Sequence, residues 1–355
     1  MQIAIITDIH FDVRDGSEYF LDKYEQFFSR QFFPHLLANN IKEVLCLGDS
    51  WENRRKLSVY AIDRARKMFY DKMVEYGIKF TTILGNHDVT FKNTNDFNSM
   101  SMFELAYENI KLIQEHEVVS FDGTKIALVS WINRDNFETQ MQFIKTTDAS
   151  IVGGHFEIND FEVSGGHKCE TGLRRKTFKH FNQVWSGHFH TKQTLGNIHY
   201  LGNPFQTNFG DLGHARGFHC FDTETLELTF HQNEFEIYDA VEFDKDLDVL
   251  AFDYAPYANK IVVVNVRNLA ETNRPKLQMF TDKLAMHCHT FTVNEYGDSV
   301  LLDGTVVNDA EMKDTREIIN EYIDGAVTQS DLRDQVKQRI HDVYAAAISV
   351  AADHE

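Results

Sequence analysis

Five short motifs in this chain carry the residue types that bind divalent cations. Each one follows a short apolar run: Asp8-Ile9-His10, Gly48-Asp49, Gly85-Asn86-His87-Asp88, His155, and Gly187-His188-Phe189-His190. Any one of these motifs alone is most often a turn or a hydrogen-bonded structural residue. Five of them in this order, each at the expected end of a strand, are not easily explained by chance or by structural need. The set therefore predicts a metal site.

The ligand types favour a pair of cations of intermediate hardness. Seven side chains are candidate ligands: Asp8, His10, Asp49, Asn86, His155, His188 and His190. None of them is a thiolate, which favours Mn²⁺, Fe²⁺ or Zn²⁺ over a soft metal. If Asp49 is shared, they fill four positions on each of two metals and leave room for water and a phosphate oxygen. Two neighbouring cations can hold a phosphoryl group and supply hydroxide at neutral pH, so we expect phosphoester hydrolysis.

The segments that carry these motifs predict an α/β layered fold. The runs before the motifs are continuously apolar, which is typical of strands buried on both faces. Residues 17–40 and 57–77 lie between the first three runs and show aromatic and leucine residues at helical spacing; the second segment stops at Gly77, a plausible helix C-cap. In such β-α-β-α-β arrangements, ligands bind beyond the carboxyl ends of the strands. We therefore expect all five motifs to meet at one cleft.

Two further parts follow. Residues 259–268 predict a strand, residues 274–288 a helix and residues 289–297 another strand, so a small β-α-β unit is expected. Residues 309–325 and 330–352 are charged and helical in pattern. We expect three domains, with boundaries at residues 1–236, 237–307 and 308–355.

Composition limits the class of protein. The formal net charge of −19 speaks against nonspecific binding to nucleic acids or anionic membranes, although metal ions can reverse the sign locally. The four cysteines show no close pairing, which argues against a zinc ribbon or a disulfide scaffold and fits a reducing cytosol. The apolar N-terminal run is too short for a membrane span and lacks a basic flank. We expect a cytoplasmic protein without a membrane partner.

The five motifs, in this order, resemble the calcineurin-like metallophosphoesterase superfamily. Within it, the "GNHD" form, the β-α-β unit and the terminal helices resemble the SbcD-type nuclease subunit, which works with an SMC-like ATPase in double-strand-break repair. The stretches "VGGHFEIND", "VWSGHFH" and "YLGNPFQT" are most similar to the form found in T-even-like phages. The resemblance covers nearly the whole chain and is closer through about Thr225. It implies a layered metallophosphoesterase core, a small DNA-binding capping domain and a C-terminal helical hairpin that grips the ATPase.

The resemblance also implies residue roles. One metal would be held by Asp8, His10, Asp49 and His190, and the other by Asp49, Asn86, His155 and His188. His87 would assist the leaving oxygen, and Asp88 would orient its imidazole. The implied metal is Mn²⁺, with Mg²⁺ or Fe²⁺ as alternatives. The implied activities are 3′-to-5′ degradation of duplex ends and endonucleolytic cleavage of single strands in DNA recombination, repair and replication, by a homodimer within a heterotetramer. A phage-encoded chain would act in the host cytoplasm.

The sequence also offers candidate contacts with DNA and with the ATPase, each with an alternative explanation. Candidate DNA contacts are Arg54, Arg55, Arg174, Arg175, Lys176 and Arg267, and Phe178 and Phe181 interleave with the basic residues of 172–181. For Arg54 and Arg55 the alternative is a solvated helix start. For residues 172–181 it is a surface helix with an apolar face, and for Arg267 it is pairing with acidic residues. The last helix places Leu332, Val336, Ile340 and Val343 on one side, either for its own core or for the ATPase. Trp51, Glu52 and Asn53 depart from the pattern of cellular members and have no assigned role.

Two alternative functions remain open. Another phosphodiesterase of the superfamily would not need the extra domain and helices, and the "GNHE" and "DRG" sequences typical of its Ser/Thr phosphatases are absent here. An inactive adaptor for the ATPase would be expected to lose metal ligands, whereas all seven candidates are present.

Overall fold

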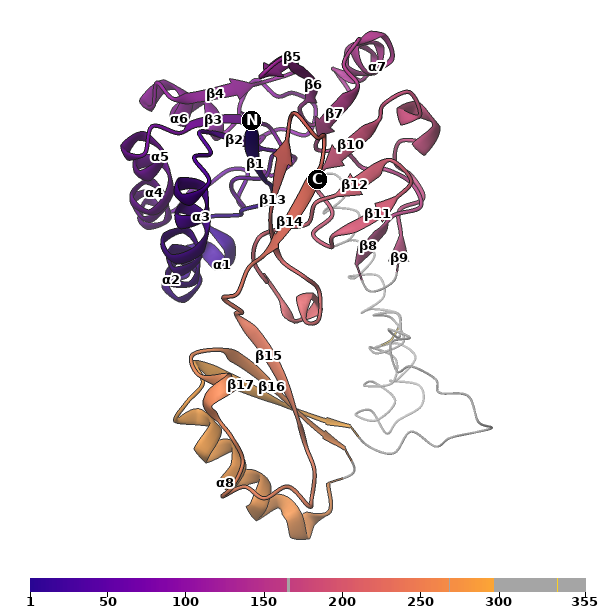
Figure 1. Ribbon diagram of the computed structural model, residues 1–355. Helices are drawn as coiled ribbons and strands as arrows, with labels where there is room; N and C mark the ends of the chain where they lie inside the picture. Colours follow the sequence, from indigo (N-terminus) through magenta and orange to yellow (C-terminus); the bar gives the residue numbers. More distant parts are fainter. Residues whose placement is uncertain (165–166, 268, 297–336, 338–355) are drawn as a thin grey trace. The chain divides into compact units, whose positions relative to one another are not determined.

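The computed structural model describes residues 1–164, 167–267, 269–296 and 337, and its core contains two six-stranded sheets (Figure 1). The first sheet has the order β14-β13-β1-β2-β3-β4. Its strands are β1 (Gln2–Ile6), β2 (Glu43–Cys46), β3 (Lys79–Ile83), β4 (Ile110–Ile113), β13 (Gly217–Asp222) and β14 (Leu228–Gln232). Strands β1 to β4 run parallel, whereas β13 and β14 extend the sheet as an antiparallel pair.

The second sheet has the order β11-β12-β10-β7-β6-β5. Its strands are β5 (His116–Phe121), β6 (Thr124–Val129), β7 (Ile151–Gly154), β10 (Gln183–Ser186), β11 (Gln193–Leu195) and β12 (Ile198–Tyr200). The four central strands are parallel, and β5 and β11 are antiparallel edge strands. A short hairpin of β8 (Glu162–Ser164) and β9 (His167–Lys168) lies outside both sheets.

Three apolar clusters show why apolar and polar residues do not alternate along the parallel strands. Ile3 and Ile5 of β1 pack with Trp185 of β10 in a cluster between the two sheets. Ala4 and Ile6 face the other way, into a cluster with the helices that cover the first sheet. A third cluster joins the second sheet to α7 (Phe137–Thr146). The central parallel strands of each sheet are buried on both faces, so the predicted α/β layered fold is confirmed.

The helices over the first sheet match the two predicted segments. The short helix α1 (Val13–Gly16) precedes the first segment, which contains α2 (Glu18–Phe27), the π-helix η1 (Phe28–Phe32) and α3 (Phe33–Ala38). The second segment contains α4 (Val59–Ala65), the π-helix η2 (Arg66–Tyr70) and α5 (Asp71–Glu75). Gly77 has a φ of 61°, and the N–H of Ile78 donates to the carbonyl of Met73 at 2.8 Å. This is the predicted glycine cap. Helix α6 (Met100–Ala106) follows the third motif.

A small parallel sheet forms the next part of the chain. It contains β15 (Tyr238–Phe243), β16 (Ile261–Arg267) and β17 (Thr290–Tyr296), and α8 (Arg274–Ala285) buries Leu277, Phe280 and Leu284 against it. The predicted β-α-β unit is therefore confirmed, with β15 added before it. Short 3₁₀ helices complete the elements: η3 (Arg175–Phe178), η4 (Phe209–Asp211), η5 (Ala255–Tyr257) and η6 (Glu271–Asn273).

The expected C-terminal hairpin falls outside the described residues, as do its candidate partner contacts Leu332, Val336, Ile340 and Val343. The domain boundaries at residues 236 and 307 stay predictions. Among the described helices, none combines the length and the apolar character that crossing a membrane requires.

Candidate metal centre

All seven predicted ligands meet at the carboxyl ends of β1, β2, β3, β7 and β10. Parallel strands present these ends at the same edge of each sheet, and the two sheets pack face to face. Five of the seven side chains belong to fully or almost fully buried residues: Asp8, His10, Asp49, Asn86 and His155. The topology thus brings together residues that are up to 182 positions apart in the chain.

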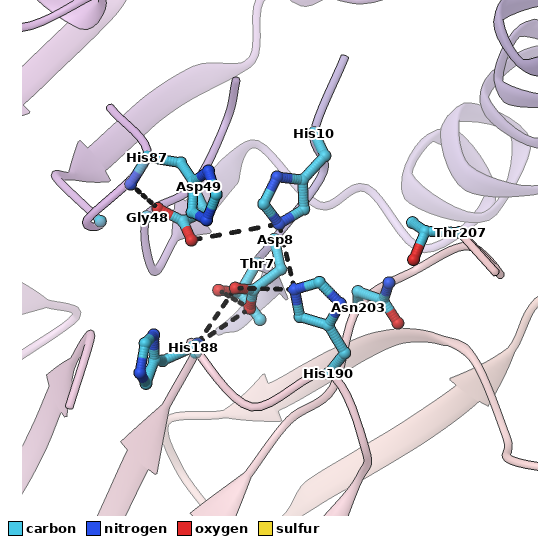
Figure 2. Close-up of polar contacts among 12 residues, drawn as sticks. Thr7, Asp8, His10, Gly48, Asp49, His87, His188, His190, Asn203 and Thr207 are labelled. Carbon is cyan, nitrogen blue, oxygen red and sulfur yellow. Dashed lines mark hydrogen bonds and ion pairs between the residues drawn. The ribbon is translucent and has the colours of Figure 1, made fainter. Parts of the chain in front are cut away.

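One cluster of ligand atoms contains Asp8, His10 and His190 (Figure 2). The Nε2 atoms of His10 and His190 lie 3.1 Å apart. Oδ1 of Asp8 lies 3.9 Å from Nε2 of His190, and Oδ2 of Asp49 lies 4.0 Å from Nε2 of His10. These separations are suitable for neighbouring ligands around one cation.

A second cluster contains Asp49, Asn86, His155 and His188. Nε2 of His155 lies 3.2 Å from Oδ2 of Asp49 and 3.1 Å from Oδ1 of Asn86. Oδ1 of Asn86 also lies 2.9 Å from Nδ1 of His188. Because the same Oδ2 atom of Asp49 borders both clusters, Asp49 is positioned between them.

The side chains fit two divalent cations, because nitrogen and oxygen atoms that can offer lone pairs to a metal converge at the centre. Nδ1 of His155 lies 2.8 Å from the carbonyl oxygen of Leu47, so it donates there. The lone pair of Nε2 then faces Asp49 and Asn86, which both present oxygen acceptors. His10 is arranged in the same way, with Nδ1 2.7 Å from Oε2 of Glu52 and Nε2 turned into the centre. Ring nitrogens anchored by a carbonyl or a carboxylate are typical of metal-binding histidines.

Without metal, protons occupy part of this acceptor cluster. Burial opposes a charge on His10, yet its contact with Glu52 and the charge of Asp49 raise its pKa to about 9. Burial likewise opposes a charge on His155, but Asp49 and Asp8 raise its pKa to about 9. Burial and the charge of His155 lower the pKa of His188 to about 3. Cation binding therefore competes with protons on two of the imidazoles.

The backbone around the centre is strained at the ligands themselves. Asp8, His10, Asp49 and His188 have φ values of 53°, 53°, 50° and 85°, in the left-handed region that residues with a Cβ rarely adopt. A Cβ at Gly85 would lie 2.1 Å from Oδ1 of Asp49, so only glycine fits there. Strained ligand residues and a tight glycine contact are expected where a rigid site is fixed by its surroundings.

His87 lies beside the first cluster. Its ring is edge-on to the ring of His10, with the centroids 5.2 Å apart. Nδ1 of His87 lies 2.6 Å from the backbone oxygen of Glu52, and the His87 N–H donates to Oδ1 of Asp49 at 2.7 Å. A backbone carbonyl therefore orients this imidazole.

The expectation that Asp88 orients the imidazole of His87 is wrong. The Asp88 carboxylate accepts hydrogen bonds from the N–H groups of Ser50 at 3.0 Å, Trp51 at 3.3 Å and Gly85 at 2.9 Å. Asp88 is fully buried, so its side chain points beneath the loop that carries Asp49. It acts on the centre by fixing this loop.

Sequence reasoning missed the role of Glu52. Its carboxylate contacts His10, and its backbone oxygen contacts His87. Asp12 in turn accepts a hydrogen bond from the Glu52 N–H at 2.7 Å and one from Nδ2 of Asn53 at 2.9 Å. Trp51 is buried and stacks on Phe103. The position of Glu52 three residues after Asp49 was the only signal, and it does not reveal where the loop turns.

Arg216 was also missed. Its Nη1 donates to the backbone oxygen of His190 and to Oδ1 of Asn203, and its Nη2 pairs with Oδ1 of Asp211 at 2.7 Å. The side chains of Arg216 and Asp211 are both nearly inaccessible to solvent. This buried ion pair holds the loop that positions His190.

The basic candidates for DNA contact lie in different places. Arg54 and Arg55 continue the loop that starts at Asp49, and Arg55 is exposed. Arg174, Arg175 and Lys176 are exposed at η3, and Arg175 pairs with Asp160 at 2.8 Å; Arg267 is exposed on β16, 3.8 Å from Glu242. Phe178 and Phe181 are buried in the cluster beneath the second sheet, which agrees with the alternative of a surface helix with an apolar face.

Comparison with known proteins assigns the class. The family model described as calcineurin-like phosphoesterase matches residues 1–192, so the chain belongs to this family of metal-dependent phosphoesterases. Over 350 residues the chain is 28% identical to "Exonuclease subunit 1" of Enterobacteria phage T4, with 98% of this chain and 99% of that protein covered.

Two solved structures are also similar. An archaeal phosphodiesterase is 13% identical, with a TM-score of 0.33 and 65% of this chain and 99% of that chain covered. A dimetal phosphatase from Danio rerio is 13% identical, with a TM-score of 0.37 and coverage of 62% and 91%.

Proposed function

We propose that this protein is a DNA nuclease that hydrolyses phosphodiester bonds with two divalent cations. The observation that carries the proposal is the pair of ligand clusters that share Asp49, with His87 beside them. The similarity to an exonuclease subunit over nearly the whole length of both chains supports DNA as the substrate.

The ligand set suits an anionic substrate. Asp8, His10, Asp49 and His190 would hold one cation, and Asp49, Asn86, His155 and His188 the other. Only two of these seven side chains are carboxylates, so they leave two divalent cations with a net positive charge. A bound pair of cations supplies charge stabilisation of the phosphoryl group and a water nucleophile at neutral pH. Oxygen and imidazole ligands suit Mn²⁺, Fe²⁺ or Zn²⁺ better than a soft metal. The family resemblance favours Mn²⁺ among them, with Mg²⁺ or Fe²⁺ as alternatives.

His87 would deliver a proton to the leaving group. Its Nδ1–H is held by the backbone oxygen of Glu52 at 2.6 Å, which leaves Nε2 as the atom that can carry a transferable proton. In the cationic form of the ring, Nε2–H donates to the departing 3′ oxygen, and the neutral ring keeps its bond to Glu52. A positioned proton donor of this kind contributes roughly 10²–10⁴-fold to the rate.

The wider proposal concerns partners. We propose that an SMC-like ATPase joins this subunit, as a heterotetramer around a homodimer, in cytoplasmic DNA recombination, repair and replication. Cleavage would proceed 3′ to 5′ on duplex ends, with endonuclease activity on single strands. Arg54, Arg55, Arg174, Arg175, Lys176 and Arg267 are the proposed DNA contacts. With a net charge of −19, the isolated subunit is expected to bind DNA weakly.

The test compares two substrates with and without the partner. Linear duplex DNA and a chromogenic phosphodiester are incubated with Mn²⁺, the protein, and an SMC-like ATPase from the same genome, in the presence or absence of ATP. The wild type and His167→Ala, which changes an exposed histidine on β9, should hydrolyse both substrates. Asp49→Asn should hydrolyse neither, and His87→Ala should bind metal but release nucleotides at least about 10²-fold more slowly.

The same experiment separates the alternatives. Turnover of the chromogenic ester without any cleavage of DNA, even with the ATPase, would identify a small-molecule phosphodiesterase. Failure to hydrolyse either substrate in a well-folded, metal-loaded protein would identify an inactive adaptor.

A further inference from the structure

A separate group of potential metal ligands lies on the first sheet, away from the five motifs. It contains His35 of α3, Cys220 of β13 and His231 of β14, and one potential ligand atom of each lies within 4.8 Å of the other two. Sγ of Cys220 is 3.5 Å from Nε2 of His35. The rings of His35 and His231 have centroids 4.2 Å apart.

The register of the β13–β14 hairpin explains this arrangement. His231 pairs with Phe218 across the antiparallel ladder, so both side chains emerge on the same face. Cys220 is two residues beyond Phe218 and therefore shares this face. His35 reaches the same face from α3 and contacts the ring of Phe218 edge-on at 5.4 Å, while His231 stacks on Phe218 at 5.0 Å.

The distance between Cys220 and His35 fits a tetrahedral site. With bonds of about 2.3 Å to sulfur and about 2.05 Å to nitrogen, two ligands at a tetrahedral angle lie roughly 3.6 Å apart. The observed separation between the Cys220 sulfur and the His35 nitrogen is 3.5 Å. A thiol hydrogen bond to His35 would explain that one contact, but it would not explain why the imidazole of His231 converges on the same place.

A surface cavity of about 290 Å³ gives access to the cluster. It is lined by all three residues and also by Asp222 and Glu227. A water molecule or a carboxylate from the cavity wall can therefore supply a fourth ligand. Cys220 itself is only 5% exposed, so its sulfur lies at the base of the cavity.

The electrostatics leave both imidazoles ready to bind. Burial lowers the pKa of His35, and burial together with the charge of His35 lowers the pKa of His231, so both rings stay neutral. Burial raises the pKa of the Cys220 thiol to about 12. A cation that binds sulfur strongly can displace this proton, whereas a hard oxygen-seeking cation cannot do so effectively.

We propose that His35, Cys220 and His231 form a Zn²⁺ site, distinct from the phosphoesterase centre, whose fourth position opens to the cavity. One thiolate and two imidazoles select Zn²⁺ over Mn²⁺, while the carboxylate, imidazole and amide set of the phosphoesterase centre accepts harder cations. The bound Zn²⁺ joins α3 to β14, the edge strand of the first sheet, and stabilises this corner of the fold.

Cobalt substitution tests the site with a signal that the phosphoesterase centre does not produce. Co²⁺ bound to a thiolate gives a charge-transfer absorption in the near ultraviolet, and the seven candidate ligands of the phosphoesterase centre include no cysteine. We expect this band in the wild type, its displacement by one equivalent of Zn²⁺, and its loss in Cys220→Ser. Cys169→Ser, which changes another buried free cysteine, should keep the band.

Two further variants separate the sites and protect the test against misfolding. Asp49→Asn should lose Co²⁺ from the phosphoesterase centre and keep the thiolate band. His231→Gln should weaken Zn²⁺ binding at least about tenfold, measured by competition with a chromogenic chelator. In the Asp49→Asn background, where the phosphoesterase centre does not bind metal, Zn²⁺ should raise the thermal midpoint of the parent protein and of Cys169→Ser but not that of Cys220→Ser. A wild type without a thiolate band at full Co²⁺ loading, or a band that persists in Cys220→Ser, would overturn the proposal.

Discussion

Removing the Glu52 carboxylate tests whether this side chain supports the metal centre through His10. Oε2 of Glu52 lies 2.7 Å from Nδ1 of His10, which directs Nε2 of the same ring into the first cluster. In Glu52→Ala the ring loses this anchor, but the backbone oxygen that holds His87 remains. We therefore expect weaker cation binding with little change in the turnover rate at saturating metal.

The size of the effect follows from the exposure of the contact. Loss of a side chain that anchors a metal ligand costs roughly 10–100-fold in metal affinity. The Glu52 side chain is 37% exposed, so water partly screens its charge, and the lower part of this range applies. We expect about a tenfold to thirtyfold rise in the metal dissociation constant, or about 1.4–2 kcal/mol. Glu52→Gln keeps an acceptor oxygen without the charge, so its effect should be smaller.

The assay is calorimetric titration of metal-free protein with Mn²⁺, with activity measured across the same metal concentrations. Glu224→Ala, which removes an exposed glutamate from the turn after β13, is the matched control and should titrate like the wild type. An unchanged dissociation constant in Glu52→Ala would refute the anchoring role. A large fall in turnover at saturating Mn²⁺ would place Glu52 in the chemistry of the reaction.

Three other predictions concern the stability of the core. Burial lowers the pKa of His219 to about 3; since an unfolded histidine titrates near 6.5, the stability due to its neutral form is complete above that pH and falls as the pH drops towards 3. Between pH 7 and pH 5, the free energy of unfolding of His219→Phe, measured with urea, should therefore fall by about 2 kcal/mol less than that of the wild type. Equal falls would contradict this reasoning. Gly85→Ala places a Cβ 2.1 Å from a carboxylate oxygen of Asp49. It should therefore lower the free energy of unfolding by more than Gly77→Ala, whose Cβ meets no atom within 4 Å and which should cost roughly 1 kcal/mol. Similar thermal midpoints for the two variants would argue against the tight packing at Gly85. Arg216→Met should cost about 3–5 kcal/mol because it leaves Asp211 buried without its partner, and additive effects in the double variant with Asp211→Asn would show that the two are not coupled.

The convergence of the seven candidate ligands could be predicted from the sequence because it follows from the topology of the sheets. Parallel strands end at the same edge of a sheet, so polar residues directly after apolar runs converge even when they are far apart in the chain. Asp8 and His188 illustrate this, since the N–H of His188 donates to Oδ1 of Asp8 at 3.0 Å. The cap at Gly77 was predictable for a similar reason, because it depends only on local backbone geometry.

Other features depend on paths that no local pattern records. The role of Asp88 was misread because adjacent residues in a turn can point in opposite directions, His87 towards the centre and Asp88 beneath the loop. The basic stretch at residues 172–181 has the composition of a nucleic-acid contact, yet Phe178 and Phe181 are needed to cover the second sheet. His35 of α3 and Cys220 of β13 come together only because the late strands β13 and β14 join the first sheet beside β1.

The most direct test of the central claim is anomalous diffraction from crystals grown with Mn²⁺. The account predicts two manganese peaks about 3.5–4 Å apart, one on each side of the Asp49 carboxylate, with His10 and His190 at one peak and His155 and His188 at the other. A single peak, or a pocket without manganese and with these imidazoles turned away, would contradict it.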